Sequence, residues 1–523
     1  MENGKAAGNE TEKKTIAAYL YKNRWIFILS FLFFILAYMT WIVNPTPRID
    51  GEILINTPYY SSGYLERGQG NLLTEYVFAS RWFNPLFSTV ISFIFMYIGT
   101  MILGYLAYQA GIDKRVSAFL GIIMLMSPIM IELFYFDMLL FKASWAYILV
   151  FLSAGFTLYA KGRIKWVCWV TALLLLYWAI STYEAFAGVY ATVIVFLYLA
   201  KYYTERKEGE IKTRKSGYPA LILRSVLILG GAIILNTIIS RLFSPNENTY
   251  LTAKVLWNQQ PIAESLHGIL SIIKKGMLGE SLFYTPFMIV LSVGVPVAAL
   301  IHVLSRKRRL LDYLFLLICV VLQVCPYLMG IVLGGYSDAI RTQLTYPLVI
   351  AMDIALLFMM CNKKIVKAGL ALLTACIVWT MSQTTMRLEY TDQIRAKEDL
   401  FVANEMIHKI DQECDNAHTP IFIIGTYTNR LNGACQRGEM IGTSIFGYAD
   451  FLSPAYFYSS LRTMYVLKTL GIERNSLTDH DLTLEARKTA TEMPSYPLDG
   501  CVKKTDKYII FKLSEDEYPA ELE

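Results

Sequence analysis

The feature that most constrains this chain is a series of long apolar segments separated by short charged connections. The first segment, Trp25–Val43, contains no charged residue. A bilayer core about 30 Å thick is crossed by a helix of roughly 20 apolar residues. With 55% hydrophobic and only 17% charged residues, the chain has more apolar surface than a soluble protein of this size could bury in its own cores. We therefore predict an α-helical polytopic membrane protein.

About eleven transmembrane helices are expected from these segments. Their approximate ranges are 25–43, 85–108, 116–133, 139–160, 164–182, 185–201, 219–242, 286–304, 311–333, 343–361 and 365–382. The connections on one side of this series, together with the N-terminal tail, contain most of the Lys and Arg of the connections. Because cytoplasmic loops are enriched in these residues, that side is predicted to face the cytoplasm. An odd number of spans then places the C-terminus outside.

The predicted spans divide the chain into three parts. Residues 1–24 form a cytoplasmic tail, which precedes an uncleaved signal anchor. Residues 25–382 form the transmembrane domain, with long outer loops at 44–84 and 243–285. Residues 383–523 form a small extracytoplasmic α/β domain, because the charge density rises and no later segment is long enough to span.

Periodicity predicts the elements outside the spans. In the C-terminal domain, helices are expected at Arg387–Cys414 and Ala455–Leu470, and strands at Pro420–Gly425 and Tyr508–Leu513. An amphipathic segment at Ile262–Leu278, in the second outer loop, is expected to lie flat on the membrane.

Several classes of function find no support in the composition. The net charge of +6 follows from the basic cytoplasmic loops and gives no reason to expect a nucleic-acid partner. No cysteine spacing resembles a zinc or haem site. Only Cys414, Cys435 and Cys501 are predicted to lie outside, so at most one disulfide can form among them.

The outer end of the first predicted span leads into the acidic sequence PRIDGE, residues 47–52. Asp50 and Glu52 flank Gly51 there and follow two prolines. Sugar transfer from a phosphate-activated donor needs a carboxylate that accepts the proton of the attacking hydroxyl, and a cation or donor group that stabilises the departing phosphate. Asp50 suits the first role, and Glu52 is a second catalytic candidate. The two carboxylates could also hold a divalent cation, although acidic residues in a solvated loop are common without any such role.

Other ionisable side chains are predicted at the same outer level. Charges at membrane depth are costly and are usually retained for a site, although each one alone is also compatible with a structural ion pair or a snorkelling end group. Arg341 is the preferred ligand of a donor phosphate because its planar guanidinium matches phosphate oxygens, a geometry that lysine lacks. The candidate substrate-binding residues are Arg48, Glu66, Arg67, Glu132, Asp137, Lys142, Tyr183, Glu184, Asp338 and Arg341.

A set of short motifs carries a resemblance to a known family. In chain order they are PRIDGE, SGYLERGQG, SPIMIELFYFD, STYEAFAGVY and the region of Arg341, followed by a helix and PIFIIG. Each motif is short, and their order is the stronger signal. Together they resemble the bacterial type II glucosyltransferase family, which includes the serotype-converting O-antigen glucosyltransferases.

The resemblance implies a C-type glycosyltransferase (GT-C) architecture in the bacterial cytoplasmic membrane, with an outward-facing active site. It implies a polyprenyl-phosphate-linked sugar, commonly glucose, as donor and a surface polysaccharide as acceptor. Such enzymes typically invert the anomeric centre in one displacement, which would make Asp50 the base and Glu52 a group that orients acceptor or donor. A nucleotide sugar is not expected, because such donors are cytoplasmic.

Three alternative functions remain open at this point. A lipid-linked sugar flippase or transporter predicts midplane charges and interrupted helices in corresponding halves. A polysaccharide polymerase or ligase would join long oligosaccharides rather than add single sugars. A sensor or scaffold, whose outer domain binds wall polymer, would need none of the convergent charges.

Overall fold

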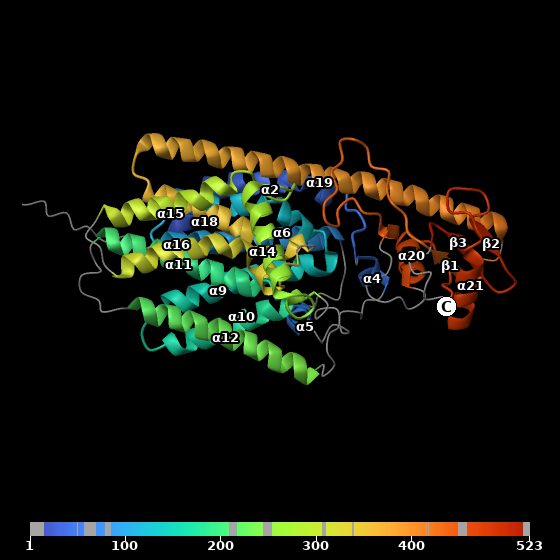
Figure 1. The fold of residues 1–523 in the computed structure, drawn as a ribbon, viewed down its shortest axis with the longest axis horizontal. Coiled ribbons are helices and arrows are strands. Elements are labelled where there is room, and N and C mark those ends of the chain that lie inside the picture. Colours follow the sequence, from blue (N-terminus) through green and yellow to red (C-terminus); the bar gives the residue numbers. More distant parts are fainter. Residues whose placement is uncertain are drawn as a thin grey trace, which may run out of the picture.

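The computed structural model describes residues 15–49, 51–56, 69–78, 85–208, 217–243, 254–305, 310–336, 339–414, 416, 418–447 and 458–515. Most of these residues are helical. Figure 1 shows a helical bundle, a long helix (α19) that runs along one side of it, and a small sheet beyond the end of the bundle. Helices α4 and α20 lie between the bundle and the sheet.

The helices in chain order are α1 (Ile16–Lys22), α2 (Arg24–Ala37), α3 (Met39–Val43), α4 (Gly51–Asn56), α5 (Gln69–Phe78), α6 (Pro85–Gln109), α7 (Lys114–Leu125), α8 (Pro128–Phe134), α9 (Asp137–Tyr159), α10 (Lys165–Thr182), α11 (Phe186–Glu208), α12 (Gly217–Phe243), α14 (Ile262–Leu278), α15 (Met288–Leu304), α16 (Leu310–Val324), α17 (Leu328–Val332), α18 (Thr345–Met360), α19 (Lys364–Glu413), α20 (Tyr458–Thr469) and α21 (His480–Ala490). The strands are β1 (Ile421–Ile424), β2 (Val502–Lys504) and β3 (Ile509–Lys512), and short 3-10 turns lie at Leu256–Asn258, Cys325–Tyr327, Ile340–Thr342 and Ile445–Gly447.

The structure confirms a mostly helical protein with several apolar spans. Among the described residues, seven helices are long and apolar enough to cross a membrane, or up to nine if the bent pairs α1–α2 and α7–α8 each form one span. Two further predicted spans coincide with the shorter apolar helices α15 and α18, of 17 and 16 residues. The count of eleven therefore stays a prediction.

One of the predicted spans is bent, and another is interrupted. The span expected at 116–133 consists of α7 and α8, which meet at 60°. Pro128 is the first residue of α8, and proline cannot continue a preceding helix because it lacks an N–H and its ring clashes with the turn before it. In the span expected at 25–43, α2 ends at Ala37 and the short α3 begins at Met39.

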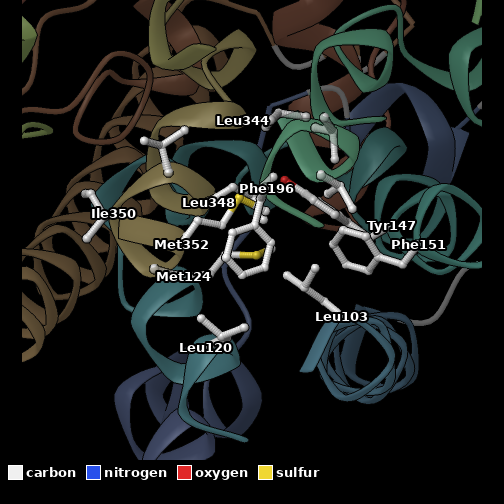
Figure 2. Close-up of a cluster of buried hydrophobic side chains, with 14 of the residues drawn as sticks. Leu103, Leu120, Met124, Tyr147, Phe151, Phe196, Leu344, Leu348, Ile350 and Met352 are labelled. Atoms are coloured by element: carbon white, nitrogen blue, oxygen red, sulfur yellow. The ribbon is translucent and has the colours of Figure 1, made fainter. Parts of the chain in front are cut away.

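The core of the bundle lies where α7, α9, α11 and α18 meet. Figure 2 shows Met124, Phe151, Phe196 and Leu348 from these four helices converging on one another, and all four are fully buried. Nearly all side chains of α18 are buried, which explains why the helix is apolar on every side. By contrast, α12 exposes many apolar residues, as expected for a helix that faces lipid.

Helix α19 joins the bundle to the C-terminal region without a break. Its 50 residues correspond to a length of about 75 Å at 1.5 Å per residue. The helix predicted at Arg387–Cys414 is its second half, so the predicted domain boundary at residue 382 falls inside a continuous helix. The C-terminal unit is therefore attached through a helix rather than through a loop at that point.

The C-terminal region is a small α/β unit. Its sheet has the order β1-β3-β2, in which β1 pairs parallel and β2 antiparallel with β3. Apolar residues of α19 and α20 pack on one face of the sheet, and those of α21 pack on the other. The strands predicted at Pro420–Gly425 and Tyr508–Leu513 are β1 and β3.

Three other sequence predictions also have an outcome. The helix predicted at Ala455–Leu470 is α20, within the part of that range that the structure describes. The helix predicted at Ile262–Leu278 is α14, with the same bounds. All eight cysteines are free, including Cys414, Cys435 and Cys501.

Shortening a core side chain should destabilise the bundle. Leu348 is fully buried in α18, so Leu348→Ala leaves a cavity and should lower the free energy of unfolding by about 3 kcal/mol. Unfolding in mixed micelles would measure this. The matched control is Leu223→Ala on α12, where the side chain is 60% exposed and less than 1 kcal/mol is expected. Equal losses in the two variants would contradict the placement of α18 at the centre.

Candidate active site

The segment before PRIDGE is fixed to the second half of α19. The backbone N–H of Trp41 donates to Glu389 Oε1 (2.8 Å), and its indole Nε1–H donates to Asp392 Oδ2 (3.0 Å). The Thr46 hydroxyl donates to the same Asp392 oxygen (2.5 Å), and Arg395 Nη2 donates to the carbonyl of Pro47 (2.7 Å). The chain that enters PRIDGE is thus held at four points by one helix.

Arg395 also connects this segment to the C-terminal region. Its guanidinium is fully buried and pairs with Asp392 Oδ1 (2.6 Å) and Asp399 Oδ2 (2.9 Å). Asp399 in turn accepts from the Ser444 hydroxyl (2.6 Å) and from the backbone N–H of Ile445 (3.1 Å). One buried cation therefore links α19, the PRIDGE segment and residues near 444.

Within PRIDGE, Arg48 and Gly51 lie against Asp137, the first residue of α9. Arg48 is 1% exposed, lies over the ring of Trp41 and pairs with Asp137 Oδ1 at 3.3 Å. At Gly51, a Cβ would lie 2.7 Å from Asp137 Oδ2, too close for any other residue without a shift. Asp50 itself lies outside the described residues. Arg48, two residues before it, and Gly51, directly after it, both lie beside the Asp137 carboxylate.

Glu52 lies in the first turn of α4 and is buried. Helix α4 contacts the C-terminal unit, since the Asn56 side-chain amide donates to the Tyr465 carbonyl and to the Thr469 hydroxyl, both at 2.9 Å. Of the two catalytic candidates of PRIDGE, Glu52 thus belongs to a helix that lies between the bundle and the sheet of the C-terminal unit.

A second charged group lies around Glu132, which is fully buried in α8. Its carboxylate accepts from the backbone N–H groups of Glu439 (2.8 Å) and Met440 (3.1 Å). The Glu439 carboxylate forms an ion pair with the Arg341 guanidinium and accepts from the Arg341 backbone N–H (3.2 Å). Arg341 also lies over the ring of Phe136, 4.4 Å from its centre. The preferred phosphate ligand of the sequence analysis thus has a carboxylate partner from the C-terminal region.

Lys142 lies among other residues than Glu132 and Arg341 do. It forms a buried ion pair with Glu75 of α5, each side chain being less than 10% exposed. The start of α5 packs against the end of α10, where Gly70 lies against Thr182 and leaves no room for a side chain. Tyr183 and Glu184 follow directly, between α10 and α11. The contacts of Lys142 therefore match the alternative to a substrate-binding role, a structural ion pair between packed helices.

The structure accordingly divides the candidates into two groups. Arg48, Glu52, Glu132, Asp137 and Arg341 gather around the turn between α8 and α9, at the end of the bundle beside α4. Lys142, Tyr183 and Glu184 lie around α5 and the α10–α11 junction. Asp50, Glu66, Arg67 and Asp338 lie outside the described residues.

The charged residues that the sequence analysis missed are Glu75, Glu389, Asp392, Arg395, Asp399 and Glu439. Four of them belong to the second half of α19, which the periodicity presented as an ordinary amphipathic helix. The signal that could have found them is charge on the buried face of that helix: Asp392 and Arg395 are three residues apart, so both point to one side. Glu439 stands in an irregular segment and gave no such signal.

Among the described residues, no group of three or more His, Cys, Asp or Glu side chains is arranged to hold a metal ion. The expectation that Asp50 and Glu52 could bind a divalent cation concerns a pair of which only Glu52 is described.

A comparison with known families bears directly on this arrangement. The family model of glucosyl transferase GtrII matches residues 39–352, more than half of the chain. The chain belongs to the glucosyl transferase GtrII family. The matched segment begins before PRIDGE and ends just after Arg341, so it includes the PRIDGE residues and both candidate groups of the bundle. Neither a curated protein nor a solved structure matches the chain.

The Lys142–Glu75 pair can be tested by a double-mutant cycle. Lys142→Met leaves the Glu75 carboxylate buried without its ammonium partner and should lower the free energy of unfolding by about 3 kcal/mol, whereas Lys142→Met with Glu75→Leu should recover most of this loss. The measurement is unfolding in mixed micelles.

The control for this cycle is Lys274→Met. Lys274 is 68% exposed and lies 3.9 Å from Glu280, so its loss should cost less than about 1 kcal/mol. A double variant as unstable as Lys142→Met alone would contradict the explanation of Lys142 and Glu75 as a structural ion pair.

Proposed function

We propose that this glucosyltransferase moves glucose from a polyprenyl-phosphate donor to a surface polysaccharide on the outer face of the bacterial cytoplasmic membrane. The observation that carries the proposal is the placement of PRIDGE: the matched family segment contains an acidic loop whose flanking residues are fixed beside Asp137 and within reach of the C-terminal unit. Family membership supplies the glucosyl transfer, and the donor, the acceptor and the chemistry are part of the proposal.

In the proposed reaction, Asp50 is the general base. A hydroxyl of the acceptor loses its proton to the Asp50 carboxylate while its oxygen attacks the anomeric carbon of glucose. The bond from this carbon to the phosphate oxygen breaks, and its electron pair leaves with the phosphate. One displacement inverts the anomeric centre and needs a single base. Glu52, one residue beyond Gly51, would orient acceptor or donor.

The rigid surroundings of PRIDGE support this role. A general base is effective only when it is held within hydrogen-bond reach of the proton that it removes. Four hydrogen bonds from α19 fix residues 41–47, and Gly51 allows the backbone to approach Asp137. Both features fix the described backbone that precedes and follows Asp50.

The donor phosphate would bind Arg341. Its guanidinium can form two parallel hydrogen bonds to phosphate oxygens, which would also stabilise the negative charge of the departing polyprenyl phosphate. The polyprenyl tail would lie between the apolar helices and lipid. In this arrangement the N-terminus is cytoplasmic, the C-terminal α/β unit is outside, and neither a nucleotide sugar nor a nucleic acid takes part.

The direct test is glucose transfer in reconstituted vesicles. The purified protein receives polyprenyl-phosphate glucose with a radioactive sugar and a cell-envelope polysaccharide as acceptor. Asp50→Asn keeps the shape of the side chain but removes its basicity, so transfer should fall at least about a hundredfold, in the range of a lost general base, with unchanged thermal unfolding.

The matched control is Asp506→Asn, an exposed aspartate of the β2–β3 turn, which should keep full activity. Full activity in Asp50→Asn would remove Asp50 from the mechanism. Label that stays on the lipid and changes leaflet only with protein present would support a flippase instead.

A further inference from the structure

Resting on the proposed function, we propose that Glu439 is a donor-site residue: it is the resident counter-ion of Arg341, and the donor phosphate binds by taking its place. The C-terminal region then takes part in donor binding through the turn at residues 437–442, here called the Glu439 turn. The matched family segment ends at residue 352, so this turn belongs to a part of the chain that the family assignment does not cover.

The first observation is that Glu439 holds Arg341 at two points. One carboxylate oxygen pairs with the guanidinium Nη1, and the other accepts from the backbone N–H of Arg341 (3.2 Å). A phosphodiester, which also presents two oxygens and one negative charge, would bind the guanidinium fork through two parallel hydrogen bonds. A phosphodiester on the fork that includes Nη1 therefore competes with the Glu439 carboxylate for that nitrogen.

The second observation is the balance of charge. Glu132 is fully buried and lies within Coulombic range of Arg341, and Asp137 stands next to Phe136, on whose ring Arg341 packs. Arg48 is already paired with Asp137. A phosphate added beside Arg341 would bring a further anion to a single cation already paired with Glu439, which is unfavourable in a site largely shielded from water. Departure of the Glu439 carboxylate restores the balance.

The third observation is how the Glu439 turn is held. Arg437 donates to the carbonyls of Gly442 (3.1 Å) and Asn429 (2.7 Å), and the Gly438 N–H donates to Ile441 O (2.9 Å). On the side of the bundle, two backbone N–H groups of the turn donate to Glu132, and the Ile441 side chain is buried in the bundle core. The exchange therefore concerns the Glu439 side chain, which would turn away from Arg341 while the backbone of the turn stays in place.

The Arg341–Glu439 pair is more exposed to solvent than the Arg395 network. The side chains of Arg341 and Glu439 are 16% and 11% exposed, whereas the Arg395 side chain is fully buried. An incoming anion can therefore reach the Arg341–Glu439 pair, while the Arg395 network remains closed to it.

The test measures binding of sugar-free polyprenyl monophosphate to the purified full-length protein in nanodiscs, with the uncharged polyprenol as reference lipid. Glu439→Gln removes the competing charge and should lower the dissociation constant for the phosphate about tenfold, with no change for the polyprenol. Glu473→Gln, an exposed glutamate of the same region, should bind like the wild type, and Arg341→Gln should lose the preference for the phosphate.

A second variant disturbs the contact between the turn and Glu132 without changing any charge. A Cβ at Gly438 would overlap Oε1 of Glu132, so Gly438→Ala must shift either the Glu132 carboxylate or the backbone next to Glu439. Either shift should weaken the Glu439–Arg341 pair and strengthen phosphate binding severalfold. Gly433→Ala is its control, because a Cβ there meets nothing within 4 Å. This variant keeps the test valid if Glu439→Gln does not fold.

Two results would overturn the exchange. If Glu439→Gln and Gly438→Ala bind the phosphate no more tightly than the wild type does, Glu439 does not compete with it, and the proposed transfer reaction still stands if wild-type vesicles move glucose. If both variants bind more weakly, Glu439 supports donor binding rather than opposing it. If neither the wild type nor any variant binds the polyprenyl monophosphate, both the exchange of Glu439 for phosphate and the donor site at Arg341 are overturned.

Discussion

The buried Arg395 guanidinium is the interaction on which the rest of the site depends. It is held between Asp392 and Asp399 and donates to the backbone of Pro47. A buried charge of this kind is tolerated only when its partners are fully in place. Its partners come from the helix itself, from the segment that precedes PRIDGE and, through Asp399, from residues near Ser444. The position of the acidic loop and that of the C-terminal unit are thereby set by one group.

Hydropathy and period were sufficient for elements whose apolar pattern is local. The apolar segments predicted at 85–108 and 139–160 are α6 and α9, and the PIFIIG run contains β1. The break before Pro128 and the continuity of α19 through residue 382 were missed. A run of apolar residues contains no information about a bend within it, and a change from apolar to polar composition does not by itself end a helix.

For the site, the sequence identified residues but not their partners. Arg341 and Glu132 were both proposed from their position at span ends, yet the group that joins them, Glu439, is 98 residues from the first and 307 from the second. Such contacts depend on how distant segments fold back. Lys142 shows the opposite case, since its charge at membrane depth suggested a site and the structure gives it a partner on a neighbouring helix.

Helix α19 has a consequence for how the enzyme is coupled to its membrane. Its first half belongs to an apolar span and its second half holds the PRIDGE segment and one face of the sheet, with no flexible joint between them. The distance between this span and the PRIDGE segment is therefore set by a rigid helix rather than by a flexible linker. A change in hydrocarbon thickness that tilts or shifts a spanning helix would carry the attached C-terminal unit with it, so lipid composition becomes a variable of the active-site geometry.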